Sequence, residues 1–163
     1  MVINYEPLNR RERIVKLFRE AIEAENRKDF ETAKRKLDEI LHESLDVEPE
    51  FYFEACFRLA DIFLQEDNFR GAVKCALRAI LRAPSDDHYR LGIKMLGDIL
   101  AIIKKENRLA ELAENMDTTL KLVEEDEELW RFTRAIVRIA RGERVKEKFS
   151  LGEFNEVIEF LSE

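Results

Sequence analysis

The chain has 163 residues, of which 45% are hydrophobic and 39% charged, and its 28 basic and 35 acidic side chains give a net charge of −7. A chain of this length and apolar content can form one packed domain, 1–163, which excludes an intrinsically disordered protein. Five glycines and three prolines supply few turns, which argues against a barrel or sandwich of many short strands, and two cysteines cannot form a disulfide framework.

Apolar residues recur at helical spacing in eight segments, and no segment alternates with a period of two over a useful length. In chain order the segments are 14–22, 30–41, 53–63, 69–80, 91–103, 109–120, 129–139 and 154–161. Two helix starts carry N-cap signals, because Glu12 follows Asn9 in a capping-box pattern and two aspartates follow Ser85. We therefore expect an all-α fold of about four antiparallel helix hairpins, at 9–44, 50–83, 86–123 and 127–162.

The connections between these segments repeat as well. Three N-capping residues, Asp29, Asn68 and Asn107, each stand one or two residues before a large apolar side chain, and they follow one another at intervals of 39 residues. Gly152-Glu153-Phe154 is a candidate fourth connection at a longer interval. A period of about 34–45 residues is typical of stacked helix hairpins, which bury their apolar faces only against their neighbours.

The segment 56–84 carries a large–small pair and an aromatic residue on its first helix, then an aromatic residue, three alanines and a closing proline. These residues are Leu59-Ala60, Phe63, Phe69, Ala72, Ala76, Ala79 and Pro84. The segment resembles a tetratricopeptide repeat (TPR), with Cys56 in place of the usual tryptophan. The other copies keep mainly the spacing, and the third can be aligned by Leu96-Gly97 or by Asn107, in registers two residues apart. The resemblance implies a right-handed α-α superhelix, a TPR-like solenoid; a generic helical bundle is the alternative.

In the family that this chain resembles, the first helix of each hairpin lines a concave groove that holds an extended peptide or a helix. The resemblance assigns eight residues to this groove: Val15, Phe18, Ile22, Phe57, Asp61, Leu64, Lys94 and Asp98. The basic clamp by which some members hold a terminal carboxylate is absent, because apolar residues occupy its places. An exposed apolar groove of this kind fits an amphipathic helix. The alternative is that the chain's own termini or a second copy fills it.

No pattern in the sequence predicts catalysis, and we expect neither an enzyme nor a metal or cofactor site. The only histidines, His42 and His88, lie on separate hairpins, and no phosphate loop, nucleophile elbow or metal-ligand spacing is present. Cys56 and Cys75 lie on the two helices of one hairpin. Two reduced, buried thiols are the simpler interpretation, and a disulfide between them is the alternative.

Charged residues cluster near the C-terminus. Five acids in a row, 124–128, stand before an expected helix whose N-terminus they favour. On that helix, the spacing of Arg131, Arg134, Arg138 and Arg141 places all four on one face. This arginine face is a possible site for phosphate, an acidic tail or RNA; the alternative is a solvated face paired with Glu127, Glu128 and Glu143. The net charge of −7 argues against nucleic-acid binding that is independent of sequence.

These observations predict a non-catalytic protein–protein interaction scaffold whose protein or peptide partner the sequence does not name. Two other hypotheses stay open. One is a structural subunit that self-associates, for example as a homodimer; the other is an adaptor that binds anions or nucleic acid through the arginine face. No apolar run of about 18 residues is present, and residues 1–6 lack the parts of a secretory signal, so we expect a cytoplasmic protein without membrane contact. Gln65 is the only glutamine, a bias shared by heat-adapted proteins and by other charged helical proteins.

Overall fold

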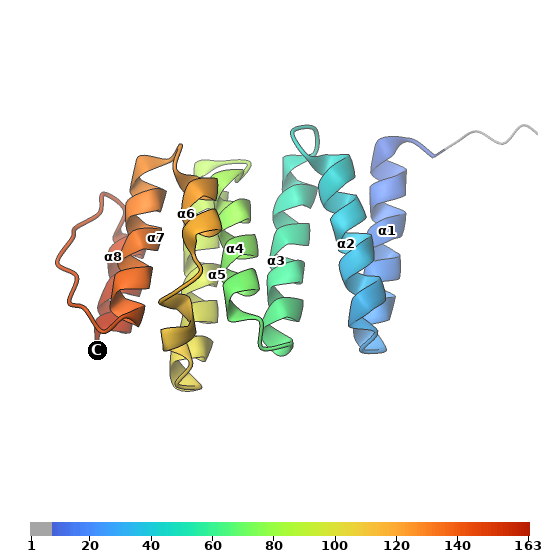
Figure 1. The fold of residues 1–163 in the computed structure, drawn as a ribbon. Helices are drawn as coiled ribbons and strands as arrows, with labels where there is room; N and C mark the ends of the chain where they lie inside the picture. The colour runs from blue at the N-terminus through green and yellow to red at the C-terminus, as the bar shows by residue number, and fades with distance from the viewer. Residues whose placement is uncertain (1–7) are drawn as a thin grey trace, which may run out of the picture.

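The computed structural model describes residues 8–163; residues 1–7, on which the expectation about a secretory signal rests, lie outside this range. Within 8–163 every regular element is a helix and no strand occurs, which confirms the all-α prediction for this part of the chain (Figure 1). The α-helices are α1 (Arg10–Asn26), α2 (Phe30–Ser44), α3 (Pro49–Gln65), α4 (Phe69–Leu81), α5 (Asp86–Lys105), α6 (Asp117–Val123), α7 (Glu127–Ala140) and α8 (Gly152–Ser162). A 3₁₀-helix, η1 (Leu109–Leu112), precedes α6. None of the helices in the described range has the length and apolarity needed to cross a membrane.

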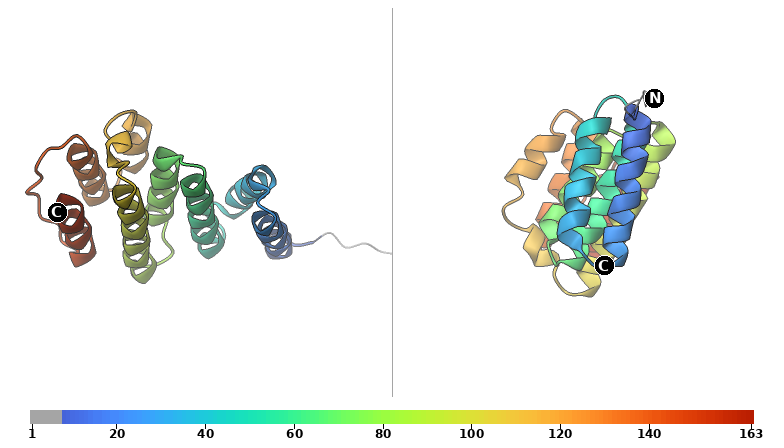
Figure 2. Two further views of the ribbon diagram at one scale, coloured as in Figure 1. Left: turned by 90° about the horizontal axis from the view of Figure 1, so that it is seen from below. Right: turned by 90° about the vertical axis from the view of Figure 1, so that its right-hand side faces the viewer.

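Helices α1 to α5 pack one after another in a row, each against the next along the chain (Figure 1). Neighbours run in opposite directions, as two ion pairs between α1 and α2 show: Arg13 lies 3.3 Å from Glu43, and Lys36 lies 2.8 Å from Glu20. Figure 2 shows the row from two further sides, with α1 and α2 at one end and α7 and α8 at the other.

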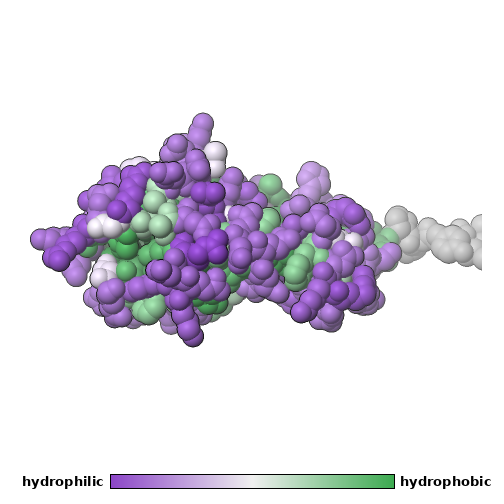
Figure 3. Space-filling view, turned by 60° about the horizontal axis from the view of Figure 1, so that its bottom comes forward, coloured by the Kyte–Doolittle hydropathy of each residue, from purple (hydrophilic) through white to green (hydrophobic). Residues whose placement is uncertain are grey.

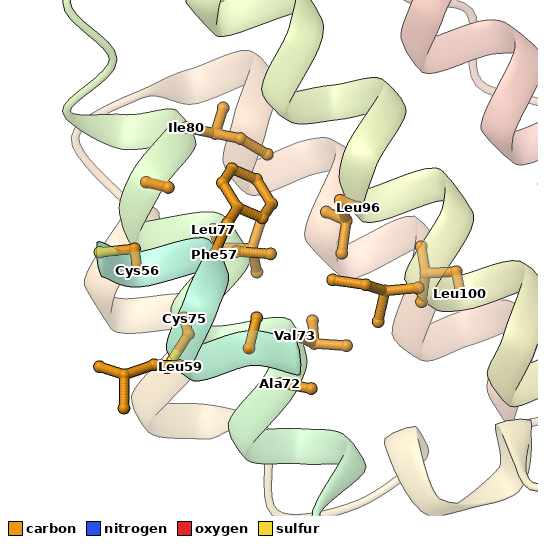
Figure 4. Packing of buried hydrophobic residues seen from close by; sticks show 14 of the residues in the cluster. Cys56, Phe57, Leu59, Ala72, Val73, Cys75, Leu77, Ile80, Leu96 and Leu100 are labelled. Atoms are coloured by element: carbon orange, nitrogen blue, oxygen red, sulfur yellow. The ribbon is translucent and has the colours of Figure 1, made fainter. Parts of the chain in front are cut away.

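Small residues at the contact between α3 and α4 allow these two helices to approach closely. Ala60 on α3 and Ala72 and Ala79 on α4 are completely buried. Figure 4 shows Phe57, Val73 and Leu77 grouped between α3, α4 and α5, where Leu96 and Leu100 complete the cluster. Alanines at these positions leave the space that the larger side chains fill, which is the close approach expected from the sequence.

Among the helices of residues 8–163, five begin with a side-chain cap. In each, an oxygen of the capping side chain accepts a hydrogen bond from the backbone N–H three residues later, at 2.9–3.2 Å. The caps are Asn9, Asp29, Asn68, Ser85 and Asp126. The N-cap predictions at Asn9, Asp29, Asn68 and Ser85 are therefore confirmed, and each cap satisfies a backbone donor that the helix leaves free.

The turns that end α1, α3, α5 and α7 share one geometry. In each, a residue with positive φ follows the helix, and the next N–H donates to the carbonyl five residues earlier, the bond of a Schellman motif. The donor and acceptor pairs are Asp29 and Ala24, Asn68 and Phe63, Arg108 and Ile103, and Glu143 and Arg138, at 2.8–3.0 Å. The positive-φ residues are Lys28, Asp67, Asn107 and Gly142, so the intervals between turns are 39, 40 and 35 residues.

This geometry corrects two expectations about the connections. Asn107 is not an N-cap; it has the positive φ of Lys28 and Asp67, and Arg108 stands where Asp29 and Asn68 cap. The third pair is therefore offset by 40 residues from the second, a register that neither alignment considered from the sequence had. The fourth turn of this kind lies at Gly142, ten residues before the connection expected at Gly152.

The second helix of the third pair, expected over 109–120, is broken into η1 and α6, and Asn115 between them has a positive φ of 61°. Arginines from neighbouring helices bind carbonyls that the break leaves free. Arg70 of α4 donates to the carbonyls of Glu111 and Glu114 at 3.3 and 3.4 Å, and Arg141 donates to that of Ala113 at 3.1 Å. The buried residues still follow a helical spacing, which explains why the sequence pattern predicts one continuous helix: Leu112, Met116, Thr119 and Val123.

The fourth hairpin expected at 127–162 is not an antiparallel helix pair. An extended segment, 141–151, runs back along α7, with Glu147 near Arg134 and Ser150 near Glu128. Helix α8 then runs in the same direction as α7 (Figure 1). Phe154 packs on Phe132 near the start of the two helices, and Ile139 and Leu161 near their ends line one pocket. The extended segment thus takes the return path that a second helix would take, and α8 packs against both α7 and α5.

Candidate functional site

The equivalent turns define which residues share a position on the first helices of the pairs. One row of positions holds Val15, Glu54 and Lys94, a second holds Phe18, Phe57 and Gly97, and a third holds Ile22, Asp61 and Ala101. We call the surface formed by these three rows on α1, α3 and α5 the first-helix face. It contains six of the eight residues that the resemblance assigns to the groove; the other two, Leu64 and Asp98, lie on α3 and α5 outside these rows.

The predicted groove residues differ in exposure. Val15 and Ile22 are 46% and 36% exposed, so α1 presents two apolar side chains to solvent. Phe18 and Phe57 are only 8% and 5% exposed, and their rings pack on Phe51 and Phe53 with centroids 5.8 and 5.0 Å apart. These two phenylalanines therefore belong to the hydrophobic core and not to an open groove surface.

The remaining predicted positions are mostly polar. Asp61, Lys94 and Asp98 are exposed, and Leu64 is half-buried. On the same side of α3, Arg58 lies 3.2 Å from Glu25 of α1 and 3.3 Å from Glu54, so one guanidinium links two first helices. Burial raises the pKa of Glu25, and Arg58 opposes that rise. The α1 and α3 part of the first-helix face therefore combines exposed apolar side chains on α1 with ion-paired side chains on α3.

Helix α8 covers the part of this face that belongs to α5. Phe154 packs edge-on against Tyr89 of α5, with centroids 6.1 Å apart, and Val157 packs against Gly97. At the other end, Lys104 donates to the carbonyl oxygens of Phe160 and Glu163 at 2.7 and 3.1 Å. A lysine at the last carbonyls of a helix complements the negative end of the helix dipole. Sequence reasoning missed Gly97 and Lys104 as contacts of α8.

Two of the predicted groove residues lie beside α8. Lys94 and Asp98 line a shallow cleft of about 450 Å³, whose opposite wall is Glu156 and Val157 of α8. A second depression, of about 460 Å³, continues along the same helices and exposes Ile102 and Phe160. Figure 3 shows one face of the molecule, on which apolar patches lie between hydrophilic side chains.

The arginine face is partly neutralised by the chain itself. The carboxylate of Glu147 lies 2.9 Å from Arg134, 3.6 Å from Arg131 and 3.9 Å from Arg138. Glu143 also pairs with Arg138, at 3.2 Å, as the alternative interpretation of the sequence expected. Glu147 was not predicted, because its approach depends on an extended segment for which the helical spacing offers no signal.

Glu128, expected to pair with the arginines, instead holds the extended segment. Its carboxylate accepts hydrogen bonds from the backbone N–H and hydroxyl of Ser150, both at 2.8 Å. Burial acts to raise the pKa of Glu128, but the hydrogen bonds from Ser150 and Leu151 outweigh burial and leave the pKa below its ordinary value. The fourth arginine, Arg141, is exposed and binds a backbone carbonyl rather than a carboxylate.

Within the described range no cluster of three or more His, Cys, Asp or Glu side chains could hold a metal ion. The ring of His88 accepts or donates a hydrogen bond with the Ser85 hydroxyl at 2.8 Å and packs edge-on against Phe53. Comparison of the chain with protein-family models, with curated proteins and with solved structures returns no match.

Proposed function

We propose that this protein is a non-catalytic protein–protein interaction scaffold of the cytoplasm, built as a right-handed TPR-like solenoid. Four turns of one geometry, at intervals of 39, 40 and 35 residues, support a repeated architecture. The row of helix pairs in Figure 1 supports it too. Repeats of this kind form extended surfaces on which partners bind.

The observation that carries the proposal is the position of α8. This helix is amphipathic, with its apolar side buried against α5 and α7 and with glutamates on its outer side. The first-helix face therefore already holds one amphipathic helix, supplied by the same chain. At the α5 end of the face, we infer that the C-terminal helix occupies the groove, in line with the alternative that a chain terminus fills it.

The α1 and α3 end of the face lacks such a cover among residues 8–163. Val15 and Ile22 stand one above the other on α1, seven residues apart, which is two helical turns. An amphipathic partner helix presents apolar side chains at the same interval. We therefore place the partner along α1, with its polar side toward Glu54 and Asp61 of α3.

The test compares two matched pairs of substitutions in affinity capture with the intact chain as bait. Val15→Asp with Ile22→Asp changes the proposed face. Leu45→Asp with Val47→Asp changes two side chains of similar exposure, 41% and 48%, in the connection between α2 and α3. Both variants should keep the helical circular dichroism of the wild type, because all four side chains are exposed.

A partner that the wild type and the Leu45/Val47 variant retain, and that the Val15/Ile22 variant loses at least tenfold, supports the proposal. Equal retention by all three proteins overturns the assignment of the partner to α1. The Phe18 and Phe57 positions are unsuitable for this test, since a charge at either buried site would unfold the protein.

A further inference from the structure

Charge is ordered by sign along the side of α7 that the extended segment flanks. Between residues 129 and 148 there are seven lysines and arginines and two glutamates, whereas 124–128 are all acidic. Glu127, Arg131, Arg134, Arg138 and Arg141 follow one another at intervals of four, three, four and three residues. They form one stripe about 21 Å long at 1.5 Å per residue. We call it the α7 stripe; it is acidic at the start of α7 and basic at its end.

The two carboxylates of the extended segment neutralise only part of the basic end. Glu147 and Glu143 pair with Arg131, Arg134 and Arg138. Four further basic residues are exposed, and within 8–163 none of them forms an ion pair with a carboxylate: Arg141, Arg144, Lys146 and Lys148. At the acidic end, Glu124, Glu125 and Glu127 are exposed. Both ends thus hold charge that is available to a partner.

An aromatic residue lies between the two ends. The guanidinium of Arg134 lies over the half-buried ring of Trp130, 4.8 Å from the ring centroid. Tryptophan and arginine are the side chains most often found at the energetic centre of protein interfaces. The extended segment beside α7 lies at the C-terminal end of the row in Figures 1 and 2, away from the face proposed for the partner helix.

We propose that the α7 stripe binds the same stripe of a second copy of this chain, with the two α7 helices antiparallel about a twofold axis near Trp130 and Arg134. Reversal about this axis brings Glu127 of one copy opposite Arg141 of the other. The arginines between them, Arg131, Arg134 and Arg138, then face one another with the neutralising carboxylates of Glu147 and Glu143 already beside them. Self-complementarity of this kind is the condition for a symmetric dimer interface. The acidic end of each copy then meets the basic end of the other. A nucleic acid or an acidic tail would find attraction at one end and repulsion by Glu124, Glu125 and Glu127 at the other.

The experiment measures the mass of the full chain in solution by light scattering and sedimentation, at several protein concentrations. Variant A carries Glu124→Lys and Glu127→Lys, and variant B carries Arg141→Glu and Arg144→Glu. Each variant alone places like charges opposite one another and should be monomeric. An equal mixture of A and B restores opposite charges at both ends and should form a heterodimer.

A control variant with Glu23→Lys and Glu39→Lys, both exposed and remote from α7, changes the net charge as variant A does and should remain dimeric like the wild type. For the wild type, salt raised from about 0.1 M to about 1 M shortens the screening length from about 10 Å to about 3 Å and should shift the equilibrium toward monomer. A monomeric wild type at all concentrations, or dimers of A alone and B alone, would overturn the proposal. Dimerisation that salt leaves unchanged would also contradict it.

Discussion

Val157 of α8 packs directly on Gly97 of α5: a Cβ atom at position 97 would lie 2.9 Å from the Cγ2 atom of Val157. In the first two pairs the same position is occupied by Phe18 and Phe57. A phenylalanine there fills the space that α8 needs, so the absence of a side chain at Gly97 lets α8 approach α5. The C-terminal helix and this glycine therefore form one structural unit.

Gly97→Phe should release α8 from α5. Overpacking a close contact lowers the unfolding free energy by about 1–3 kcal/mol. Here the overpacked contact is the one between α5 and α8, so α8 should detach first. We expect faster hydrogen exchange in 152–162 and a lower midpoint of urea unfolding. Leu91→Phe on the same helix is the control, because Leu91 is exposed and its replacement meets no packed neighbour. Unchanged exchange in α8 would contradict the role assigned to Gly97.

Gly142 and Gly152 provide a matched test of the fourth turn. A Cβ atom at either position has open space around it, but Gly142 has a positive φ of 86°. Gly142→Ala should therefore destabilise the protein by about 1 kcal/mol through backbone strain alone. Gly152→Ala, in the first turn of α8, should be neutral or stabilise by up to about 1 kcal/mol. Chemical denaturation of both variants measures the difference, and equal stabilities would count against the turn geometry.

The raised pKa of buried Tyr52 leads us to expect a loss of folding stability at alkaline pH. Burial is the main cause that raises its pKa to about 12, with a smaller contribution from Cys56, whereas a tyrosine in the unfolded chain titrates near 10. Because the unfolded state releases the proton first, the stability is intact below about pH 10. It falls by at most about 1.4 kcal/mol per pH unit as the pH rises toward 12.

Tyr52→Phe removes this contribution, so the variant should lose less stability than the wild type between about pH 10 and 12. Urea unfolding at both ends of that range measures the two slopes. The comparison is between variant and wild type because Cys75, whose pKa burial raises to about 11, titrates in an overlapping range in both proteins. Identical slopes would show that Tyr52 is accessible to solvent.

The two cysteines are free and buried in the structure. Burial raises the pKa of both thiols, so little reactive thiolate is present at neutral pH. A thiol reagent should react slowly with the native protein and titrate two thiols per chain under denaturing, non-reducing conditions. Fewer than two would favour the disulfide that the sequence left as an alternative.

Local patterns in the sequence predicted much of this structure. Asn9, Ser85 and the buried alanines Ala60, Ala72 and Ala79 have the structural roles expected of them. These predictions depend on interactions within three or four residues or on the volume of one side chain. Local patterns do not reveal a break inside an expected helix, such as the one between η1 and α6. The buried positions keep their helical spacing across the break, while its free backbone carbonyls accept hydrogen bonds from Arg70 and Arg141.

The sequence by itself determined most of the helices, most of their boundaries and the first interval of 39 residues between connections, because helical spacing and N-caps are local properties of the chain. Only the tertiary structure decided that Phe18 and Phe57 are buried, that Glu147 lies among the arginines and that α8 runs in the same direction as α5 and α7. Each of these depends on which surfaces meet after the chain folds. For α8 the contact joins Val157 to Gly97, 60 residues away, and no periodicity within either helix encodes that distance.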